Sequence, residues 1–350
     1  MTINTPWDAP IPAPDAGAAD TAWQRQIQLT KPPGSLGRLE TAAVRLAAQQ
    51  GVPRPALERV WITVFAGDHG VCDEGVSAFP QAVTAQMVQN FAAGGAAISV
   101  LARHLNATLE VVNAGTVTSL QALAGVRDEP VMPGTANAVH EPAMSPSQRD
   151  RALELGDAAA GRAQDAGAEL FIGGDMGIGN TTAAAAVACA LLGASPDELV
   201  GRGTGLDDDG LTRKRRVVAA ALDRHGNDGS PLAVLASLGG LEIAALAGAI
   251  RGAACRGVPV LVDGFIVSVA ALVAVRHTPD VAAWLHFSHR SAEAGHDAVL
   301  RALDAEPLLD LGMRLGEGSG AATAVPLLQA ACRLHGEMAT FESAGVSDGG

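Results

Sequence analysis

The sequence has little of what disulfide-bonded or nucleic-acid-binding proteins need. It has four cysteines and no C-x-x-C pair, so we expect neither a disulfide framework nor a zinc knuckle. Lysine and arginine number 24 against 37 aspartates and glutamates, and the net charge is −13. This balance argues against nucleic acid or an anionic membrane surface as a partner. It does not exclude an anionic small molecule, because one pocket can be locally positive.

Long apolar runs and a leader pattern are also missing. The longest weakly polar run, residues 183–194, is far shorter than the ~20 residues that a membrane-spanning helix needs. The first ten residues, M-T-I-N-T-P-W-D-A-P, contain neither the basic start nor the apolar core of a signal peptide. With the scattered cysteines, these absences predict a cytoplasmic protein.

What is present is apolar and glycine-rich. Hydrophobic residues make up 48% of the 350 residues and charged residues 17%, which excludes global disorder and predicts a substantial core. Many of the 41 glycines follow apolar runs, where turns and ligand-binding loops are built. The length suits one large domain, or one large and one small. Residues 1–28, rich in Pro, Ala and Asp, are predicted to form an arm on the surface.

The rest of the chain alternates between short apolar runs and longer alanine-rich stretches with helical spacing. The predicted strands are Val60–Ala66, Thr108–Asn113, Glu169–Ile172, Val258–Val262 and Trp284–Phe287. The first, third and fourth are almost continuously apolar, which is typical of strands buried on both faces in a parallel sheet. The predicted helices are Ala82–Arg103, Ser147–Ala166, Thr181–Leu192, Asp209–His225, Leu241–Arg256, Ile266–Arg276, Ala292–Leu303 and Gly320–Leu334.

This alternation predicts an α/β doubly wound fold with a parallel sheet. One helix start is explicit, because Ser145 can cap a helix that has Pro146 at its first position and Gln148 at its third. Ligands of such folds bind beyond the carboxyl ends of the strands. The polar residues and glycines of this sequence gather at those ends.

The strongest local signal is E-L-F-I-G-G-D-M-G-I-G-N-T-T, residues 169–182. A strand there runs through a glycine-rich loop into a helix, and exposed N–H groups with the helix dipole suit such a loop to an anion. The spacing approaches a P-loop, so an ATPase or kinase is one alternative, but Asn180 stands in the lysine position. A monophosphate or ribose fits better, and a tight turn without a ligand remains a further alternative.

A second glycine-rich stretch is G-R-G-T-G-L-D-D-D-G-L-T-R-K, residues 201–214. The aspartates 207–209 could suggest magnesium, but they are better placed to cap the helix that begins near Asp209. Lys214 lies within two turns of that cap and could reach a phosphate in the glycine loop. For the neighbouring Arg213, Arg215 and Arg216, a solvated basic face is an equally good interpretation.

The third stretch, residues 65–87, begins F-A-G-D-H-G-V. Asp68 and His69 end a buried strand and could be an acid–base or metal pair, but further ligands at metal-site spacing are missing, and residues in this position often only brace a loop. From Ser77 onward, phenylalanine, proline and methionine alternate with serine and glutamine. This mixture suits the wall of a pocket for a flat, mostly apolar ring.

The fourth stretch, L-L-D-L-G-M-R-L-G-E-G-S-G-A-A, covers residues 308–322. Glu317 lies between two glycines before an apolar helix, where burial would raise its pKa toward that of a general base. Capping of the helix start is an equally good interpretation of the same residue. Asp263 and the F-S-H-R-S-A-E segment (287–293) also follow strands, and Asp263 could bind a ribose hydroxyl or cap the next helix.

In this order, six motifs resemble one family closely. They are K-P-P-G-S-L-G-R-L-E (31–40), G-D-H-G-V, G-G-D-M-G-I-G-N-T-T, G-R-G-T-G-L, V-D-G-F and L-G-E-G-S-G-A-A. The family is that of the nicotinate-nucleotide–dimethylbenzimidazole phosphoribosyltransferases of cobalamin lower-ligand assembly. The resemblance covers about residues 25–335.

The resemblance implies a homodimer with a Rossmann-like α/β domain (61–304) and a small helical domain (29–60 and 305–345). It implies Glu317 as the general base, with no cofactor and no metal. The implied nucleotide-binding residues are Asp175, Met176, Gly177, Asn180, Thr181, Gly203, Gly205, Lys214, Asp263 and Ser291. The implied base-binding residues are Ser77, Gln86 and Leu315.

Two features set this chain apart. The family often has glutamate where Asp175 stands, so the reach toward a ribose is shorter by one methylene. Tyrosine is absent, so aromatic packing on the base must come from Phe79 or another apolar side chain. The expected reaction moves phosphoribose from nicotinate mononucleotide to a benzimidazole, with inversion at the anomeric carbon. A non-catalytic binder of nucleotides or vitamin precursors is the other alternative.

Overall fold

The computed structural model describes residues 9–203 and 205–347. Within these ranges a six-stranded parallel sheet has the order β3-β2-β1-β4-β5-β6. The strands are Val60–Gly67 (β1), Thr108–Gly115 (β2), Val126–Asp128 (β3), Leu170–Met176 (β4), Val260–Val262 (β5) and Leu285–Phe287 (β6). The predicted parallel α/β fold is confirmed, with all five expected strands in place. The short β3 was not predicted, because V-R-D is partly exposed and has no apolar run.

The order of the strands reverses beside β1, which pairs with β2 on one side and β4 on the other. This is the switch point at which doubly wound sheets open a crevice at the carboxyl ends of their strands. Residues 68 and 69, 177–180 and 263–264 follow β1, β4 and β5 at this edge of the sheet.

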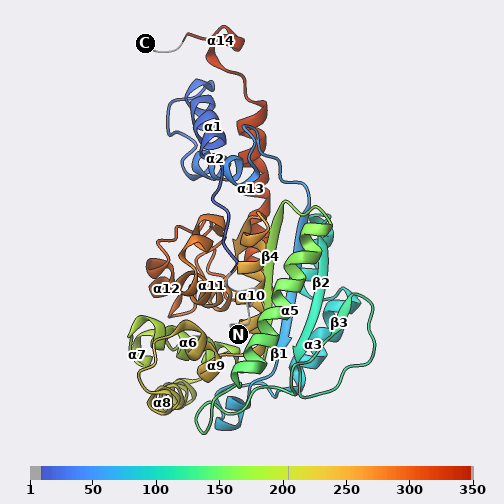
Figure 1. Cartoon of the computed structure of the whole chain (residues 1–350), viewed down its shortest axis with the longest axis vertical. Helices are drawn as coiled ribbons and strands as arrows, with labels where there is room; N and C mark the ends of the chain where they lie inside the picture. Colours follow the sequence, from blue (N-terminus) through green and yellow to red (C-terminus); the bar gives the residue numbers. More distant parts are fainter. Residues whose placement is uncertain (1–8, 204, 348–350) are drawn as a thin grey trace.

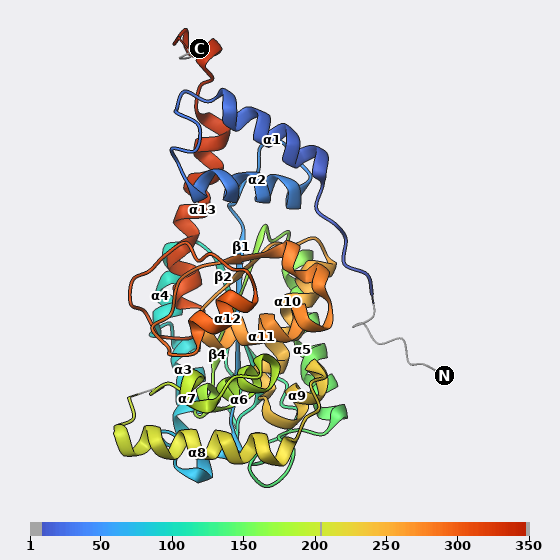
Figure 2. The same cartoon turned by 90° about the vertical axis from the view of Figure 1, so that its left-hand side faces the viewer.

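The helices cover both faces of the sheet (Figures 1 and 2). They span Ala16–Gln28 (α1), Arg38–Gln50 (α2), Ala82–Ala93 (α3), Ala97–His104 (α4), Pro146–Asp165 (α5), Asn180–Leu192 (α6), Pro196–Leu199 (α7), Asp208–His225 (α8), Pro231–Leu238 (α9), Leu241–Cys255 (α10), Phe265–His277 (α11), His296–Ala302 (α12), Ser319–Glu337 (α13) and Phe341–Ala344 (α14), with 3-10 turns at Gly70–Glu74 (η2) and Pro279–Trp284 (η3). No helix in the described ranges is long and apolar enough to cross a bilayer.

Side chains alternate across the sheet and build one core on each face. Phe65 and Phe171 pack among α5, α6, α10 and α11, whereas Val64 and Ile172 pack among α3, α4 and α13. Nearly continuous apolar strands are therefore explained by burial on both sides. Helices α5 and α10 approach so closely that a β carbon at Gly156 would collide with the α10 backbone.

Three expectations about helices need correction. The arm predicted for residues 1–28 contains a helix that was not expected, α1 (16–28) behind the N-cap Asp15; residues 1–8 lie outside the described ranges. The single helix predicted for 82–103 is two helices, α3 and α4, separated at Gly94 with φ +82°. The helix predicted from 292 begins only at His296. The capping box at Ser145 is confirmed, since its side chain accepts from Gln148 N–H.

Helices α1 and α2 pack against each other, and α2 packs on α13, beyond one end of the sheet (Figures 1 and 2). Arg25 of α1 donates to the carbonyl groups of His335, Gly336 and Met338 at the end of α13. A buried ion pair, Lys31 to Glu40 at 2.8 Å, holds the loop before α2. The division into two domains at the predicted boundaries stays a prediction.

Candidate active site

A pocket of about 520 Å³ opens at the carboxyl ends of β4 and β5. Most of the residues expected from the sequence line it. These are Phe79, Asp175, Met176, Gly177, Asn180, Thr181, Gly203, Asp263, Ser291, Leu315 and Glu317. They come from separate segments of the chain, which the fold brings to one edge of the sheet.

Glu317 lies in a sharp bend before α13, with φ +70°, and is only 5% exposed. Its Oε2 accepts a hydrogen bond from the N–H of Ile98, in the first turn of α4, at 3.2 Å. The capping interpretation is therefore partly right, but the capped helix is α4 and not α13, whose N-cap is Gly318. Burial raises the pKa of Glu317, and the Ile98 hydrogen bond opposes that shift. A buried carboxyl of raised pKa suits a general base.

Asp175 lies next to Glu317, at the end of β4. Its backbone carbonyl accepts from Glu317 N–H at 3.1 Å, and its Oδ2 accepts from the Asn180 amide at 3.0 Å. Burial raises its pKa well above the ordinary value, and the charges of Asp263, Glu242 and Glu317 raise it further. A carboxyl in this setting tends to keep its proton and can donate a hydrogen bond.

Asp263 follows β5 and is almost completely buried. Its Oδ1 accepts from Ala321 N–H, in the first turn of α13, at 2.7 Å. Asp263 therefore caps a helix, but the capping alternative named the wrong one: the capped helix is α13 and not α11, the helix that follows Asp263. Burial raises its pKa to about 7, against the effect of the backbone hydrogen bonds. Contact with a ribose stays a prediction, and Asp263 does line the pocket.

Lys214 does not line the pocket but lies directly behind it. Its ammonium donates to Thr181 Oγ1 at 2.8 Å, and its contact with a phosphate stays a prediction. A β carbon on Gly203 would stand 3.1 Å from Lys214 Nζ, so the glycine keeps this corner open. Burial lowers the pKa of Lys214 to about 8, partly offset by Glu293.

Three other expected residues lie outside the pocket wall. Gly205 has φ +114° in an open loop. The Ser77 hydroxyl accepts from Phe79 N–H at 3.2 Å, and Gln86 is exposed on α3. Contact of these residues with a substrate stays a prediction.

The sequence interpretation missed several lining residues, chiefly Arg314, Glu293, Phe265 and Ile266. Arg314 Nη1 donates to the Gly203 carbonyl at 3.1 Å, so it joins the Glu317 loop to the second glycine loop. Its position three residues before Glu317 in L-G-M-R-L-G-E-G could have identified it. Phe265 and Ile266 begin α11. They were not predicted as lining residues because the whole helix is apolar and nothing in its sequence distinguishes them from core residues.

The acidic residues and the histidine that suggested a metal site make other contacts in the structure. Asp207 caps α8 by accepting from Gly210 N–H at 2.8 Å, and Asp208 pairs with Arg202. His69 lies 2.8 Å from Glu242, not in a ligand set. Within residues 9–203 and 205–347, no group of three His, Cys, Asp or Glu is placed to hold a metal ion.

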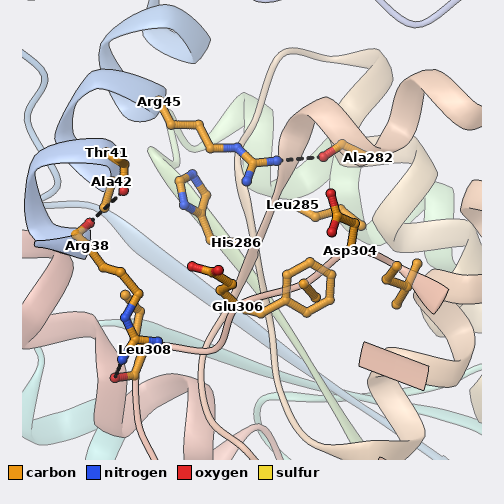
Figure 3. A pocket seen from close by; sticks show the side chains of 13 residues that line it. Arg38, Thr41, Ala42, Arg45, Ala282, Leu285, His286, Asp304, Glu306 and Leu308 are labelled. Carbon is orange, nitrogen blue, oxygen red and sulfur yellow. Dashed lines mark hydrogen bonds between the residues drawn. The ribbon is translucent and has the colours of Figure 1, made fainter. Parts of the chain in front are cut away.

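A second pocket, of about 310 Å³, lies between α2 and β6. Figure 3 shows His286 between Arg38 and Arg45, with Glu306 facing them. Burial lowers the pKa of His286 to about 3, helped by the charge of Arg45. None of the residues predicted for the active site lines this pocket.

Comparison with known proteins places this site in a family. A family model described as phosphoribosyltransferase matches residues 11–346. The nicotinate-nucleotide–dimethylbenzimidazole phosphoribosyltransferase of Azotobacter vinelandii is 61% identical over 338 residues, 96% of each chain. The enzyme of the same name from Pseudomonas putida is 60% identical over 335 residues, 95% of each chain.

A solved structure agrees with these sequences. The crystal structure of nicotinate-nucleotide–dimethylbenzimidazole phosphoribosyltransferase from Thermus thermophilus is 48% identical, with a TM-score of 0.91. The match covers 96% of this chain and 100% of that one. The matches run through every segment that lines the pocket, and the chain therefore belongs to the nicotinate-nucleotide–dimethylbenzimidazole phosphoribosyltransferase family of transferases.

Proposed function

We propose that the chain transfers the phosphoribosyl group of nicotinate mononucleotide to 5,6-dimethylbenzimidazole, giving α-ribazole phosphate and nicotinate for cobalamin biosynthesis. The names of the relatives supply the substrates. The observation that carries the proposal is the joint position of Glu317 and the glycine-rich loop at 177–180 in one pocket. A base and an anion-binding loop are what this transfer needs.

The chemistry needs one proton acceptor. The bond between the anomeric carbon and the pyridine nitrogen breaks, and its electron pair neutralises the ring, so nicotinate leaves without protonation. The lone pair of one benzimidazole nitrogen forms the new bond from the opposite face, which inverts the anomeric centre. The proton on the other ring nitrogen passes to the Glu317 carboxylate. A positioned carboxylate of this kind accelerates a reaction by about 10²–10⁴-fold.

The phosphate is assigned to the corner at Gly203. The ammonium of Lys214, the hydroxyl of Thr181 and the guanidinium of Arg314 meet there. The N-terminus of α6 begins at Asn180 in the same wall, and its N–H groups favour an anion. Two cations and a helix end outweigh the nearby carboxylate of Glu293.

The benzimidazole is assigned to the apolar part of the wall. Phe79, Leu315 and Ile266 lie on the pocket, and Phe79 is 50% exposed, so its ring is free to stack on a flat ligand. This assignment follows the predicted wall for a mostly apolar ring. No cofactor or metal takes part, and we expect EDTA to leave nicotinate release unchanged.

A homodimer and a cytoplasmic location complete the proposal. Trp23 and Ile27, one turn apart on α1, are 43% and 49% exposed, which supports an apolar contact with a second copy. Sedimentation should give the mass of a dimer, and Trp23→Glu should shift it toward the monomer. A monomeric wild-type protein would contradict this part of the proposal.

The decisive experiment incubates the chain with both substrates and measures nicotinate release by chromatography. Glu317→Gln should keep the affinity for nicotinate mononucleotide and lose about 10²-fold or more in kcat. Glu306→Gln, an exposed carboxyl on the preceding loop, is the matched control and should behave as wild type. Near-normal kcat in Glu317→Gln would contradict the base assignment, and binding without turnover in the wild type would favour the non-catalytic binder.

A further inference from the structure

Directly beneath the substrate loop lies a buried pair that the proposed mechanism does not use. His69 Nε2 and Glu242 Oε1 are 2.8 Å apart, and their side chains are 1% and 0% exposed. His69 follows β1, and Glu242 lies in the first turn of α10. A histidine and a carboxylate buried together cost solvation free energy, so their presence calls for an explanation beyond packing.

Three glycines make room for this pair. A β carbon at Gly177 would stand 3.3 Å from His69 Nε2, and one at Gly67 would stand 2.9 Å from Glu242 Oε2. One at Gly240 would collide with the His69 ring. Gly177 also lines the proposed substrate pocket, so a single backbone residue separates the pair from this pocket.

The loop rests on the same segment through further contacts. Ile178 N–H donates to Thr84 Oγ1 at 3.1 Å, and Cys72 Sγ donates to the Ile178 carbonyl at 3.1 Å. The Gln81 amide donates to the His69 carbonyl at 2.7 Å. The residues that follow β1 thus pack beneath the loop, and the His69–Glu242 pair lies among them.

We propose that His69 and Glu242 act together as positioning residues for nucleotide binding: their pair holds the Gly177 backbone in the place from which the loop contacts the substrate. This inference rests on the proposed function. Glu242 lies in the first turn of α10, at the positive end of the helix dipole. Neither residue reaches the pocket surface.

The pair makes a specific kinetic prediction. Glu242→Gln keeps the size and a hydrogen bond to His69 but removes the charge. A displaced loop should raise KM for nicotinate mononucleotide by about tenfold or more, and kcat should fall as well, because small misplacements are costly in a reacting complex. KM for the benzimidazole should change much less, since its assigned wall includes neither Gly177 nor Ile178.

Glu110→Gln is the matched control. Glu110 is also a buried carboxyl, held by Arg127 and Arg162, but it lies near the start of β2 and away from the pocket. It should lower the thermal unfolding midpoint without moving either KM. If Glu242→Gln lowers the midpoint and leaves both KM values and kcat unchanged, the pair is only structural and the inference is wrong.

Two more variants keep the test decisive if Glu242→Gln folds poorly. His69→Gln should raise the same KM, and the double variant His69→Gln/Glu242→Gln should lose no more than the worse single variant, because the two residues act as one unit. Independent, multiplying losses would contradict the inference. Calorimetric titration with nicotinate mononucleotide alone separates the hypotheses: a wild type that does not bind it contradicts the proposed function, whereas a wild type and Glu242→Gln that bind it equally contradict only the inference.

Discussion

The backbone carbonyl of Glu317 packs against the α carbon of Gly174, so closely that any β carbon at position 174 would collide with it. Gly174 lies within β4, and Glu317 lies in the bend before α13. The sheet therefore locates the proposed catalytic base through a contact that only glycine permits. The raised pKa of Glu317 follows from the burial that this contact enforces.

Gly174→Ala should push the Glu317 bend away from β4. Overpacking of this kind costs about 1–3 kcal/mol in stability, and displacement of the base should lower kcat by about tenfold or more. Gly336→Ala, near the end of α13 with open space around its α carbon, is the control and should leave kcat unchanged. Equal kcat in both variants would show that the contact does not position Glu317.

The pH profile should report the raised pKa of Glu317. A base works when deprotonated, so kcat should fall as pH is lowered through this pKa, and the acid limb should lie above the ordinary value of 4.5. Measurement of kcat from about pH 4 to about pH 8 under saturating substrates tests this. The residual rate of Glu317→Gln should lack that limb. A limb that persists in the variant would belong to the substrate or to another carboxyl, such as Asp175.

Lys214 should limit nucleotide binding on the alkaline side. Its ammonium has a pKa lowered to about 8, so its charge is present below that pH and lost above it. The substrate phosphate is already a dianion there, since its second pKa is about 6. KM for nicotinate mononucleotide should therefore rise as the pH is raised through about 8. Lys214→Gln should have a higher KM at neutral pH and no such rise; an equal rise in the variant would assign it to another group.

The sequence predicted which residues lie at the strand ends better than it predicted their hydrogen-bond partners. Apolar runs locate β1, β4 and β5, and the residues that follow parallel strands must meet at one edge. The partner of Glu317 is Ile98, 219 residues away, and no local pattern indicates that contact. The positive φ of Glu317 was equally hidden, because the flanking glycines suggest a bend without saying which residue adopts it. Helix α1 was missed because its mixed Ala, Gln and Asp composition shows no clear apolar periodicity. Its buried face is defined only by its packing against α2, which the sequence does not indicate.

Arg314 offers a test of the phosphate assignment. Its guanidinium is held at Gly203 by one hydrogen bond, which leaves further donors for a ligand. Hydrogen bonds to charged groups contribute about 1.5–3 kcal/mol, so Arg314→Gln should raise KM for nicotinate mononucleotide by about tenfold or more. Arg301→Gln, an exposed arginine on α12, should leave this KM unchanged.

Substrate analogues then decide which anion Arg314 binds. With nicotinate riboside, which lacks the phosphate, wild type and Arg314→Gln should have the same kcat/KM, because the lost contact no longer has a partner. With nicotinamide mononucleotide, which keeps the phosphate and lacks the carboxylate, the variant should still be about tenfold worse. If the difference instead disappears with the amide and persists with the riboside, Arg314 binds the carboxylate of the leaving group, and the phosphate must rely on Lys214 and the N-terminus of α6.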